Sequence, residues 1–325
     1  MEFDVVVVGG GHAGCEAAAA AARMGARTIL CSLDLARLGQ MSCNPAVGGI
    51  AKGHLVRELD ALGGIMGEVA DRTGIQFRLL NVSRGPAVQA PRCQSDKYKY
   101  INYITALLRG IGPLSLCAAE VVGLSIEKDS GKDPGKNTVR GVTLADGREI
   151  RCRAAILTTG TFLNGVLRIG DRHWSGGRIG ETAAVPLATA LREWGFNLGR
   201  LKTGTPPRLD RNTIDYSQFT EQKGDTVQTF FSLRSRAVSL PQISCHLGYT
   251  TPQLHTIIRE NLDKSALYGG YITGVGPRYC PSVEDKIVKF ADKERHQIFL
   301  EPEGLDTDEV YLNGMSNSMP VEVQD

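Results

Sequence analysis

The hydrophobic pattern at the start of the chain predicts a strand, a helix and a second strand. Residues 3–8 form a β-branched run, FDVVVV, short enough for a strand that is buried on both faces. Three glycines end this run, and the alanine-rich segment 13–24 predicts a helix. Residues 27–32 (RTILCS) are typical of a second buried strand, and further helices are expected at 53–62 and 96–108. This order predicts the opening of a doubly wound α/β sheet.

The pattern changes after this unit, where alternating runs predict an antiparallel meander over about 119–152. Asp146 and Gly147 stand between two such runs, which is a strong hairpin signal. Residues 154–158 (AAILT) then predict a buried strand that ends in a glycine at position 160. A meander followed by such a strand is typical of FAD-type dinucleotide-binding folds.

A chain of 325 residues is long enough for two domains. We expect residues 1–201 to form the dinucleotide-binding domain. Prolines and threonines are frequent and periodicity is poor over 202–281, which predicts an inserted α+β domain. Strand-like runs at 298–301 and 310–312 lead us to expect that 282–325 returns toward the first domain.

Composition narrows the class of protein without fixing a partner. There are 37 basic and 35 acidic residues, so a formal charge of +2 neither demands nor forbids a nucleic-acid partner. No apolar run approaches the length of a membrane span, and no basic segment precedes the first apolar run, so neither a span nor a signal peptide is expected. The eight cysteines include no CxxC pair, which indicates a reducing, cytoplasmic setting. No histidine pair has metal-ligand spacing, so no metal site is predicted.

A glycine motif lies between the first strand and the first helix, which is the context that gives GxGxxG its meaning. Gly9 allows the tight turn, Gly11 lets the backbone approach a pyrophosphate, and Gly14 lets the helix pack on the strand. The phosphates are expected on free N–H groups at the helix start. The predicted contacts are Gly9, Gly10, Gly11, His12, Ala13 and Gly14.

One departure from the dinucleotide pattern concerns the ribose. An acidic residue is expected at the end of the second strand, but that strand ends at Ser32, and Asp34 lies slightly beyond it. The ribose contact is therefore expected from Ser32, Asp34 or backbone. The glycines alone leave FAD and NAD open, and the meander with its following strand favours FAD.

Several unusual segments carry a resemblance to a known family. They are 38–53 (LGQMSCNPAVGGIAKG), 74–80 (GIQFRLL), 85–86 (GP), 160–165 (GTFLNG), 199–208 (GRLKTGTPPR), 276–286 (GPRYCPSVEDK) and 296–304 (HQIFLEPEG). Over essentially the whole chain they closely resemble the tRNA uridine-modifying flavoprotein family known as MnmG or GidA. MSCNPAVGG and PRYCPSVEDK are highly specific to it.

The resemblance implies a function. The family binds FAD, reduces it with NADH or NADPH, and works as a homodimer with a GTPase of the MnmE type. It modifies carbon 5 of the wobble uridine in certain tRNAs, with methylenetetrahydrofolate as the one-carbon source. For FAD it further implies contacts at Ser32, Val121 and Gly160. For NAD(P)H it implies the segment 276–290, with Gly276, Pro277, Arg278, Tyr279, Glu284, Asp285, Lys286 and Phe290.

Cys43 and Cys280 match the family's two functionally implicated cysteines. Carbon 5 of uracil is a poor nucleophile, and a thiolate that adds at carbon 6 would make it enolate-like. Arg278 lies beside Cys280 and Lys286 is near it, so these cations favour its thiolate. The remaining cysteines are expected to be structural or stay unassigned.

For several other charged residues, the sequence leaves two possible roles open. Glu284 and Asp285 are acid–base groups or simply pair with neighbouring cations. Five cations are either phosphate contacts or solvated surface charges. They are Lys52, Arg178, Lys202, Arg208 and Lys286.

The length of the chain differs from that of the family. Full-length members are about twice as long, so we expect this chain to be an N-terminal portion. Alone, it should bind FAD weakly or not at all and should not complete tRNA modification. The alternatives are a folate- and FAD-dependent tRNA uridine methyltransferase and a catalytically silent dinucleotide-binding fragment. A flavin disulfide or quinone reductase is disfavoured because its usual cysteine pair is missing.

Overall fold

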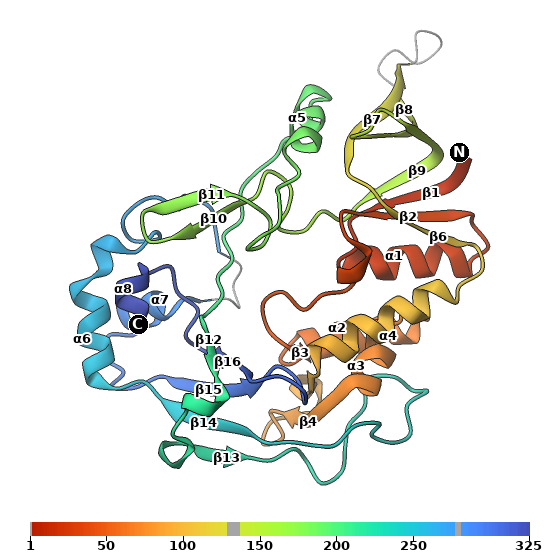
Figure 1. Cartoon of the computed structure of the whole chain (residues 1–325). Coiled ribbons are helices and arrows are strands. Elements are labelled where there is room, and N and C mark those ends of the chain that lie inside the picture. Colours follow the sequence, from red (N-terminus) through yellow and green to blue (C-terminus); the bar gives the residue numbers. More distant parts are fainter. Residues whose placement is uncertain (1, 129–136, 277–280) are drawn as a thin grey trace.

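The largest sheet joins parallel and antiparallel strands. A computed structural model describes residues 2–128, 137–276 and 281–325 (Figure 1). In sheet order, the six strands are β6 (Leu114–Ala118), β2 (Thr28–Ser32), β1 (Glu2–Val8), β9 (Glu149–Leu157), β8 (Asn137–Leu144) and β7 (Val121–Lys128). The first four run parallel, and β7, β8 and β9 are antiparallel neighbours. This is the predicted doubly wound α/β fold of the FAD type, with its meander.

β9 (Glu149–Leu157) combines two strands that we expected to be separate. We expected a meander ending near 152 and a separate strand at 154–158. In the structure β9 is continuous, and its first residues pair antiparallel with β8 while most of its length pairs parallel with β1. The turn before it is the predicted hairpin, with Gly147 at φ +84°.

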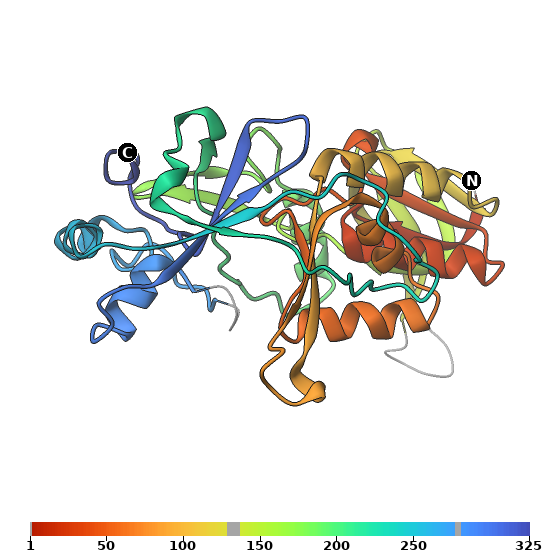
Figure 2. The same cartoon turned by 90° about the horizontal axis from the view of Figure 1, so that it is seen from below.

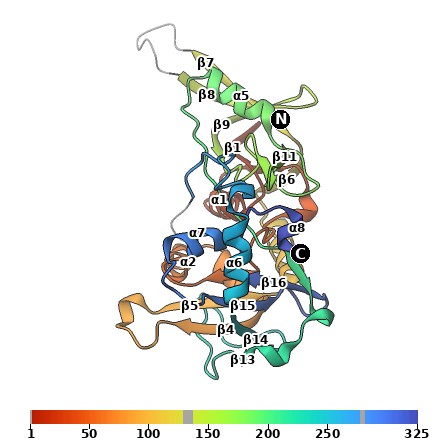
Figure 3. The same ribbon diagram turned by 90° about the vertical axis from the view of Figure 1, so that its left-hand side faces the viewer.

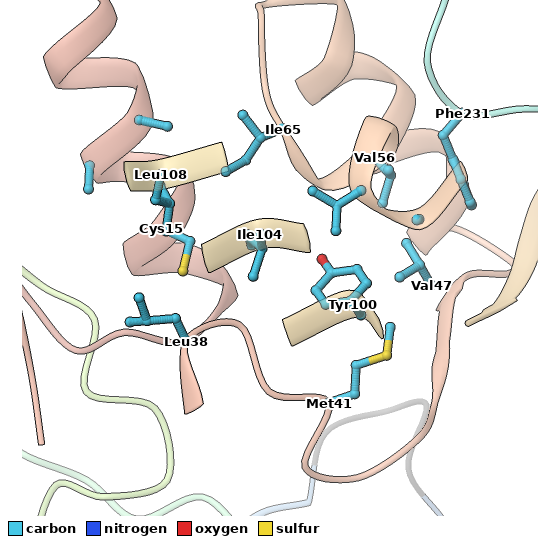
Figure 4. Packing of buried hydrophobic residues seen from close by; sticks show 14 of the residues in the cluster. Cys15, Leu38, Met41, Val47, Val56, Ile65, Tyr100, Ile104, Leu108 and Phe231 are labelled. Carbon is cyan, nitrogen blue, oxygen red and sulfur yellow. The ribbon is translucent and has the colours of Figure 1, made fainter. Parts of the chain in front are cut away.

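Helices cover both faces of this sheet, as the alternation within β1 requires. Val7 points into a core with α1 (His12–Arg23) and α4 (Lys97–Arg109), which Figure 4 shows around Cys15, Ile104 and Leu108. Val6 and Val8 point into a second core with α5 (Val185–Glu193). The apolar run of β1 is thus buried on both faces.

A smaller layer follows on the α1 side. Its helices are α2 (Lys52–Ala61) and α3 (Met66–Thr73), and its antiparallel strands are β3 (Ala46–Gly48), β5 (Ala90–Ser95) and β4 (Gly74–Leu80). α2 and α4 confirm the helices expected from the sequence, whereas α3 was not predicted. Asp96 caps α4 by accepting the backbone N–H groups of Tyr98 and Lys99.

A second sheet joins residues from both sides of the segment 252–289. In order, its antiparallel strands are β12 (Arg208–Asp210), β16 (Glu309–Asn313), β15 (Gln297–Pro302), β14 (Cys245–Tyr249) and β13 (Thr220–Gln222). β15 and β16 are the two strands expected near the end of the chain. We expected 282–325 to return toward the FAD domain; these strands pair within the second sheet, and Glu301 and Glu303 of this segment pair with Arg92 and Lys97 of the first domain. The domain boundaries themselves stay a prediction.

The remaining elements lie at the end of the molecule away from the six-stranded sheet. They are α6 (Pro252–Glu260), α7 (Val283–Lys289), α8 (Val321–Gln324), and the hairpin of β10 (Val166–Ile169) and β11 (Arg172–Ser175). Figure 2 shows these C-terminal helices opposite the N-terminal sheet, and Figure 3 shows α6 beside α7 and α8. Short 3-10 turns cover Leu35–Arg37, Pro86–Val88, Arg211–Thr213, Tyr216–Gln218 and Leu262–Lys264.

Candidate functional site

In the glycine turn, Gly9 and Gly14 are closely packed, whereas Gly11 faces open space. A Cβ at Gly9 would lie 2.4 Å from the carbonyl oxygen of Thr158, and one at Gly14 would lie 1.8 Å from that of Gly9. Gly9 also has φ +108°, which favours glycine. A Cβ at Gly11 would meet nothing within 4 Å. The turn is therefore closely packed against β9 and open at the position where a pyrophosphate would approach.

The first turn of α1 has free backbone N–H groups and no negative charge, which favours the binding of an anion. Gly11 is its N-cap and provides no capping side chain, and the first turn holds no acidic residue. Burial lowers the pKa of His12 to about 4, so its ring is neutral at pH 7. The ring contacts Tyr100 edge-on. The N–H groups of residues 11–14 are thus the groups at this turn that would hold phosphate, and they fit one.

The residues expected around the rest of FAD lie at the ends of neighbouring strands. Ser32 ends β2, and its hydroxyl donates to the carbonyl oxygen of Asp34 at 3.3 Å. The carboxylate of Asp34 caps its own turn, which leaves Ser32 or backbone as the better ribose contact. The Val121 side chain is buried, so a cofactor contact there would use backbone. Gly160 has φ +55°, and a Cβ added there would meet nothing within 4 Å.

Cys43 contacts a strand that is remote in sequence. Its Sγ lies 3.5 Å from the hydroxyl oxygen of Tyr311 in β16 and 3.5 Å from the carbonyl oxygen of Gly204. Tyr311 is buried, and burial raises the pKa of its phenol, which stays protonated at neutral pH. The half-buried thiol therefore faces a hydroxyl that can donate to it as a thiolate.

An ionic network holds the Cys43 loop against the second sheet. Arg208 donates to the carbonyl oxygen of Cys43 at 2.8 Å, and its guanidinium lies 4.7 Å from the ring centre of Tyr311. Arg208 also pairs with Glu303, which is 1% exposed and pairs with Lys97 as well. Two cations thus share one buried carboxylate. From the sequence, Arg208 was either a phosphate contact or a solvated surface charge; in the structure it pairs with the buried Glu303.

The two acids expected in the nicotinamide segment differ in environment. Glu284 is fully buried and accepts hydrogen bonds from Ser318 N at 2.8 Å, Ser318 Oγ at 3.0 Å and Ser265 Oγ at 3.3 Å. The cation-pairing alternative does not describe this arrangement, because the partners of Glu284 are hydroxyl and backbone groups of the core. The acid–base role of Glu284 stays a prediction. Asp285 pairs with Lys289 at 2.6 Å, which matches the cation-pairing reading.

The rest of the nicotinamide segment borders an open pocket of about 430 Å³. Lys286 and Phe290 line it together with Lys293 and Arg295. Burial lowers the pKa of Lys286, whose ammonium group donates to the carbonyl oxygen of Gly314 at 2.9 Å. Gly276 is described, whereas Pro277, Arg278, Tyr279 and Cys280 lie outside the described residues.

The other cysteines divide as expected where they are described. Burial raises the pKa of Cys15 and Cys31 to about 12, and it also raises that of Cys152. Cys117 is half-buried on β6. The two unassigned residues, Cys93 and Cys245, prove to be 0% and 1% exposed, so both are packing residues.

Sequence reasoning missed the partners of Cys43. Tyr311 lies in a segment recognised as a strand and Arg208 in a recognised motif, but nothing local marks them as neighbours of residue 43. Within residues 2–128, 137–276 and 281–325, no three His, Cys, Asp or Glu side chains are grouped to hold a metal ion. Across the same ranges, no helix is long and apolar enough to cross a membrane.

Comparison with known proteins gives consistent matches. The sequence profile of the family described as glucose inhibited division protein A matches residues 4–325. Proteins named tRNA uridine 5-carboxymethylaminomethyl modification enzyme MnmG are 51% identical in Protochlamydia amoebophila and 53% identical in Aquifex aeolicus. These matches cover 100% and 99% of this chain and 51% and 52% of the relatives. The chain thus spans about half the length of the curated relatives it matches.

The solved structure of Aquifex aeolicus GidA in one crystal form superposes with a TM-score of 0.91 at 53% identity. It covers all of this chain and 54% of that one. A second crystal form of the same protein gives a TM-score of 0.89. The sequence and the fold therefore agree over the full length, and the chain belongs to the glucose inhibited division protein A (GidA) family.

Proposed function

We propose that this chain is the dinucleotide-binding portion of an enzyme that modifies carbon 5 of the wobble uridine of tRNA. The strongest support is its identity of just over one half, along its whole length, to enzymes named for that modification. The substrate would place it in the cytoplasm. The partners we propose are tRNA, a GTPase of the MnmE type and a second copy of the chain.

FAD is the cofactor that we propose for the glycine turn, and NAD(P)H is its proposed reductant. Support comes from the fit of the turn, where Gly9 and Gly14 exclude side chains and Gly11 leaves room for a pyrophosphate. When bound, these cofactors would supply reducing equivalents, and methylenetetrahydrofolate would supply the carbon. Ser32, Val121 and Gly160 would complete the FAD site, and the segment 276–290 would contact the nicotinamide nucleotide.

Cys43 is a candidate nucleophile for the uracil ring, as is Cys280 by its motif. Cys43 is supported by its environment, because Tyr311 faces its sulfur and Arg208 fixes its backbone. The residues of this chain would thus hold the thiol, orient it, and keep a hydroxyl donor beside it. The methyltransferase and the silent fragment remain the alternative functions.

A spectroscopic experiment separates an enzyme from a silent fragment. The purified chain is titrated with FAD, its visible spectrum is recorded, and NADH is added without oxygen. Bleaching of a bound flavin supports a working reductive half-reaction, whereas bound flavin that NADH cannot bleach argues for a silent fragment.

The tRNA part of the proposal needs cells in which this gene is the sole source of the activity. Nucleosides of their tRNA are analysed with the gene unchanged, with Cys43→Ser, and with Cys117→Ser on β6 as the matched control. We expect Cys43→Ser to remove the substituent at carbon 5 of the wobble uridine. Loss of a methyl group from another uridine would favour the methyltransferase instead.

A further inference from the structure

Lys202 is a buried cation that lacks an acceptor. It is 8% exposed, although lysine is seldom buried without a partner. Among the residues that the structure describes, its ammonium group makes no hydrogen bond or ion pair. Asp285 interacts with its charge at longer range, but that carboxylate is paired with Lys289 at 2.6 Å. A buried, uncompensated ammonium group is costly, so the site favours an anion.

Ser316 brings an unused hydroxyl to the same place. It is also 8% exposed, and its Oγ finds no hydrogen-bond partner in the described part of the chain. Its backbone carbonyl oxygen, by contrast, accepts from Val283 N at 2.7 Å. A buried hydroxyl without a partner costs free energy, and in a native structure it often marks a place for a ligand.

Gly204 lies beside both groups and has no side chain. A Cβ at this position would lie 2.5 Å from Ser316 Oγ and 3.9 Å from Lys202 Nζ. An isolated bridge between Thr205 and Asn317 holds the two segments together. The ammonium group and the hydroxyl therefore lie near the same Cα, and a side chain there would clash with the hydroxyl.

Cys43 reaches the same glycine through its sulfur. Its Sγ is 3.5 Å from the carbonyl oxygen of Gly204, in the loop before β12 that runs beside β16 in Figure 1. The thiol thus lies near the carbonyl oxygen of Gly204, and the ammonium group and the unpaired hydroxyl lie near its Cα. They come from three segments of the chain, near residues 43, 202 and 316.

We propose that Lys202 and Ser316 form an anion site for the O4 oxygen of a uracil ring that a thiolate attacks. This inference rests on the proposed function and deepens it. In the step, the sulfur forms a bond to carbon 6, and the electron pair of the C5–C6 double bond moves to carbon 5 and onto O4. No atom leaves and no oxidant is needed. The product is an enolate, whose negative oxygen takes the ammonium group and the hydroxyl as donors.

The number of donors favours a single oxygen over a phosphate. A phosphate presents three oxygens, and its sites usually combine several backbone N–H groups with the side chains. Here one cation and one hydroxyl converge. Donors placed where charge develops stabilise the transition state, and the loss of one typically lowers the rate about a hundredfold or more.

The anion site can be tested without tRNA by comparing two alkylating reagents on Cys43. Iodoacetate carries a carboxylate and iodoacetamide is neutral, so the ratio of their rates, read by mass spectrometry of the Cys43 peptide, reports a nearby cation. We expect Lys202→Met to lower this ratio about tenfold or more, because one charge is lost at close range. Lys202→Arg should keep most of the ratio, and Ser316→Ala should lower it less.

Lys223→Met is the matched control, since this lysine is exposed and pairs at the surface with Glu221. It should leave the ratio unchanged. The same ratio in the unchanged chain and in Lys202→Met would overturn the anion site, because its cation would then not act on the thiol.

A protection experiment identifies the anion. 5-Nitrouridine, which is ionised at neutral pH, should slow alkylation of Cys43 in the unchanged chain and not in Lys202→Met. Protection by inorganic phosphate without protection by 5-nitrouridine would overturn the uracil assignment. Should tRNA modification fail while these Lys202-dependent effects persist, the proposed function falls and the anion site stands.

Discussion

The sulfur of Cys43 and the hydroxyl oxygen of Tyr311 lie 3.5 Å apart, although 268 positions separate them in the sequence. The phenol stays protonated because burial raises its pKa, so it can donate to a thiolate and cannot take its proton. The contact joins the loop after β2 to a strand of the second sheet. The candidate nucleophile thus lies where this loop contacts the second sheet.

Replacing Tyr311 by Phe should slow the reaction of Cys43 with iodoacetamide. The ring would keep its packing, but the thiolate would lose one hydrogen bond, so we expect a decrease of about three- to tenfold near neutral pH. Mass spectrometry of the Cys43 peptide measures it. Tyr249→Phe, on the exposed side of β14, serves as control. A rate that is unchanged in Tyr311→Phe would show that the hydroxyl does not act on the sulfur.

Replacing Glu303 by Gln should destabilise the fold strongly. The buried carboxylate pairs with both Lys97 and Arg208, so its loss takes this counterion from Arg208 and leaves Lys97 with Glu309 alone. We expect the free energy of unfolding to drop by about 3 kcal/mol, measured by urea denaturation.

The matched control is Glu127→Gln, which removes an exposed pair with Arg140 and should change stability far less. Equal losses in the two variants would mean that the buried network contributes no more than a surface pair.

Two substitutions in the glycine turn should have different effects on the stability of the fold. Gly14→Ala places a Cβ against the carbonyl oxygen of Gly9, and we expect it to lower the free energy of unfolding by about 2 kcal/mol or more. Gly11→Ala adds a methyl group to open space at an ordinary φ of −74°, so the fold should be little changed. Thermal denaturation compares the two. Equal melting temperatures would contradict the backbone contact.

His12 should make the fold sensitive to acid. Its pKa is lowered to about 4 in the folded chain and is 6.5 ordinarily, so between these values the unfolded chain binds more protons. The free energy of unfolding should therefore fall as the pH falls through this window, by up to about 1.4 kcal/mol per pH unit from this group.

Urea denaturation at several pH values measures this slope. His12→Gln should flatten it, whereas His173→Gln on the exposed strand β11 should not. A slope that is the same with and without His12 would refute the assignment.

Local signals account for the parts of the fold that could be predicted. β1, α1 and β2 follow from apolar periodicity and the glycine motif, and the hairpin before β9 follows from Asp146–Gly147. The continuity of β9 could not be foreseen, since its two halves pair with different neighbours in different directions. Each half has its own pattern of apolar and polar residues, and their continuity depends on pairing with the neighbouring strands of the sheet.

The candidate site was predicted in part for the same reason. Cys43 stood out through its motif, but the roles of Tyr311, Ser316 and Glu303 depend on contacts across the second sheet that no local pattern encodes. Glu284 shows the opposite case. Its motif suggested acid–base chemistry or a cation partner, and in the structure it is buried among serine hydroxyls with no cation paired to it in the described part of the chain.

The most direct test of the account is a titration of the purified chain with FAD, followed by quenching of flavin fluorescence, for the unchanged sequence and for Gly11→Ala. The methyl group would occupy the space through which the pyrophosphate approaches the N–H groups of α1. We predict saturable but weak binding that Gly11→Ala lowers about tenfold or more in a chain that remains folded. FAD binding that is identical in both proteins would contradict the assignment of this turn as the flavin site.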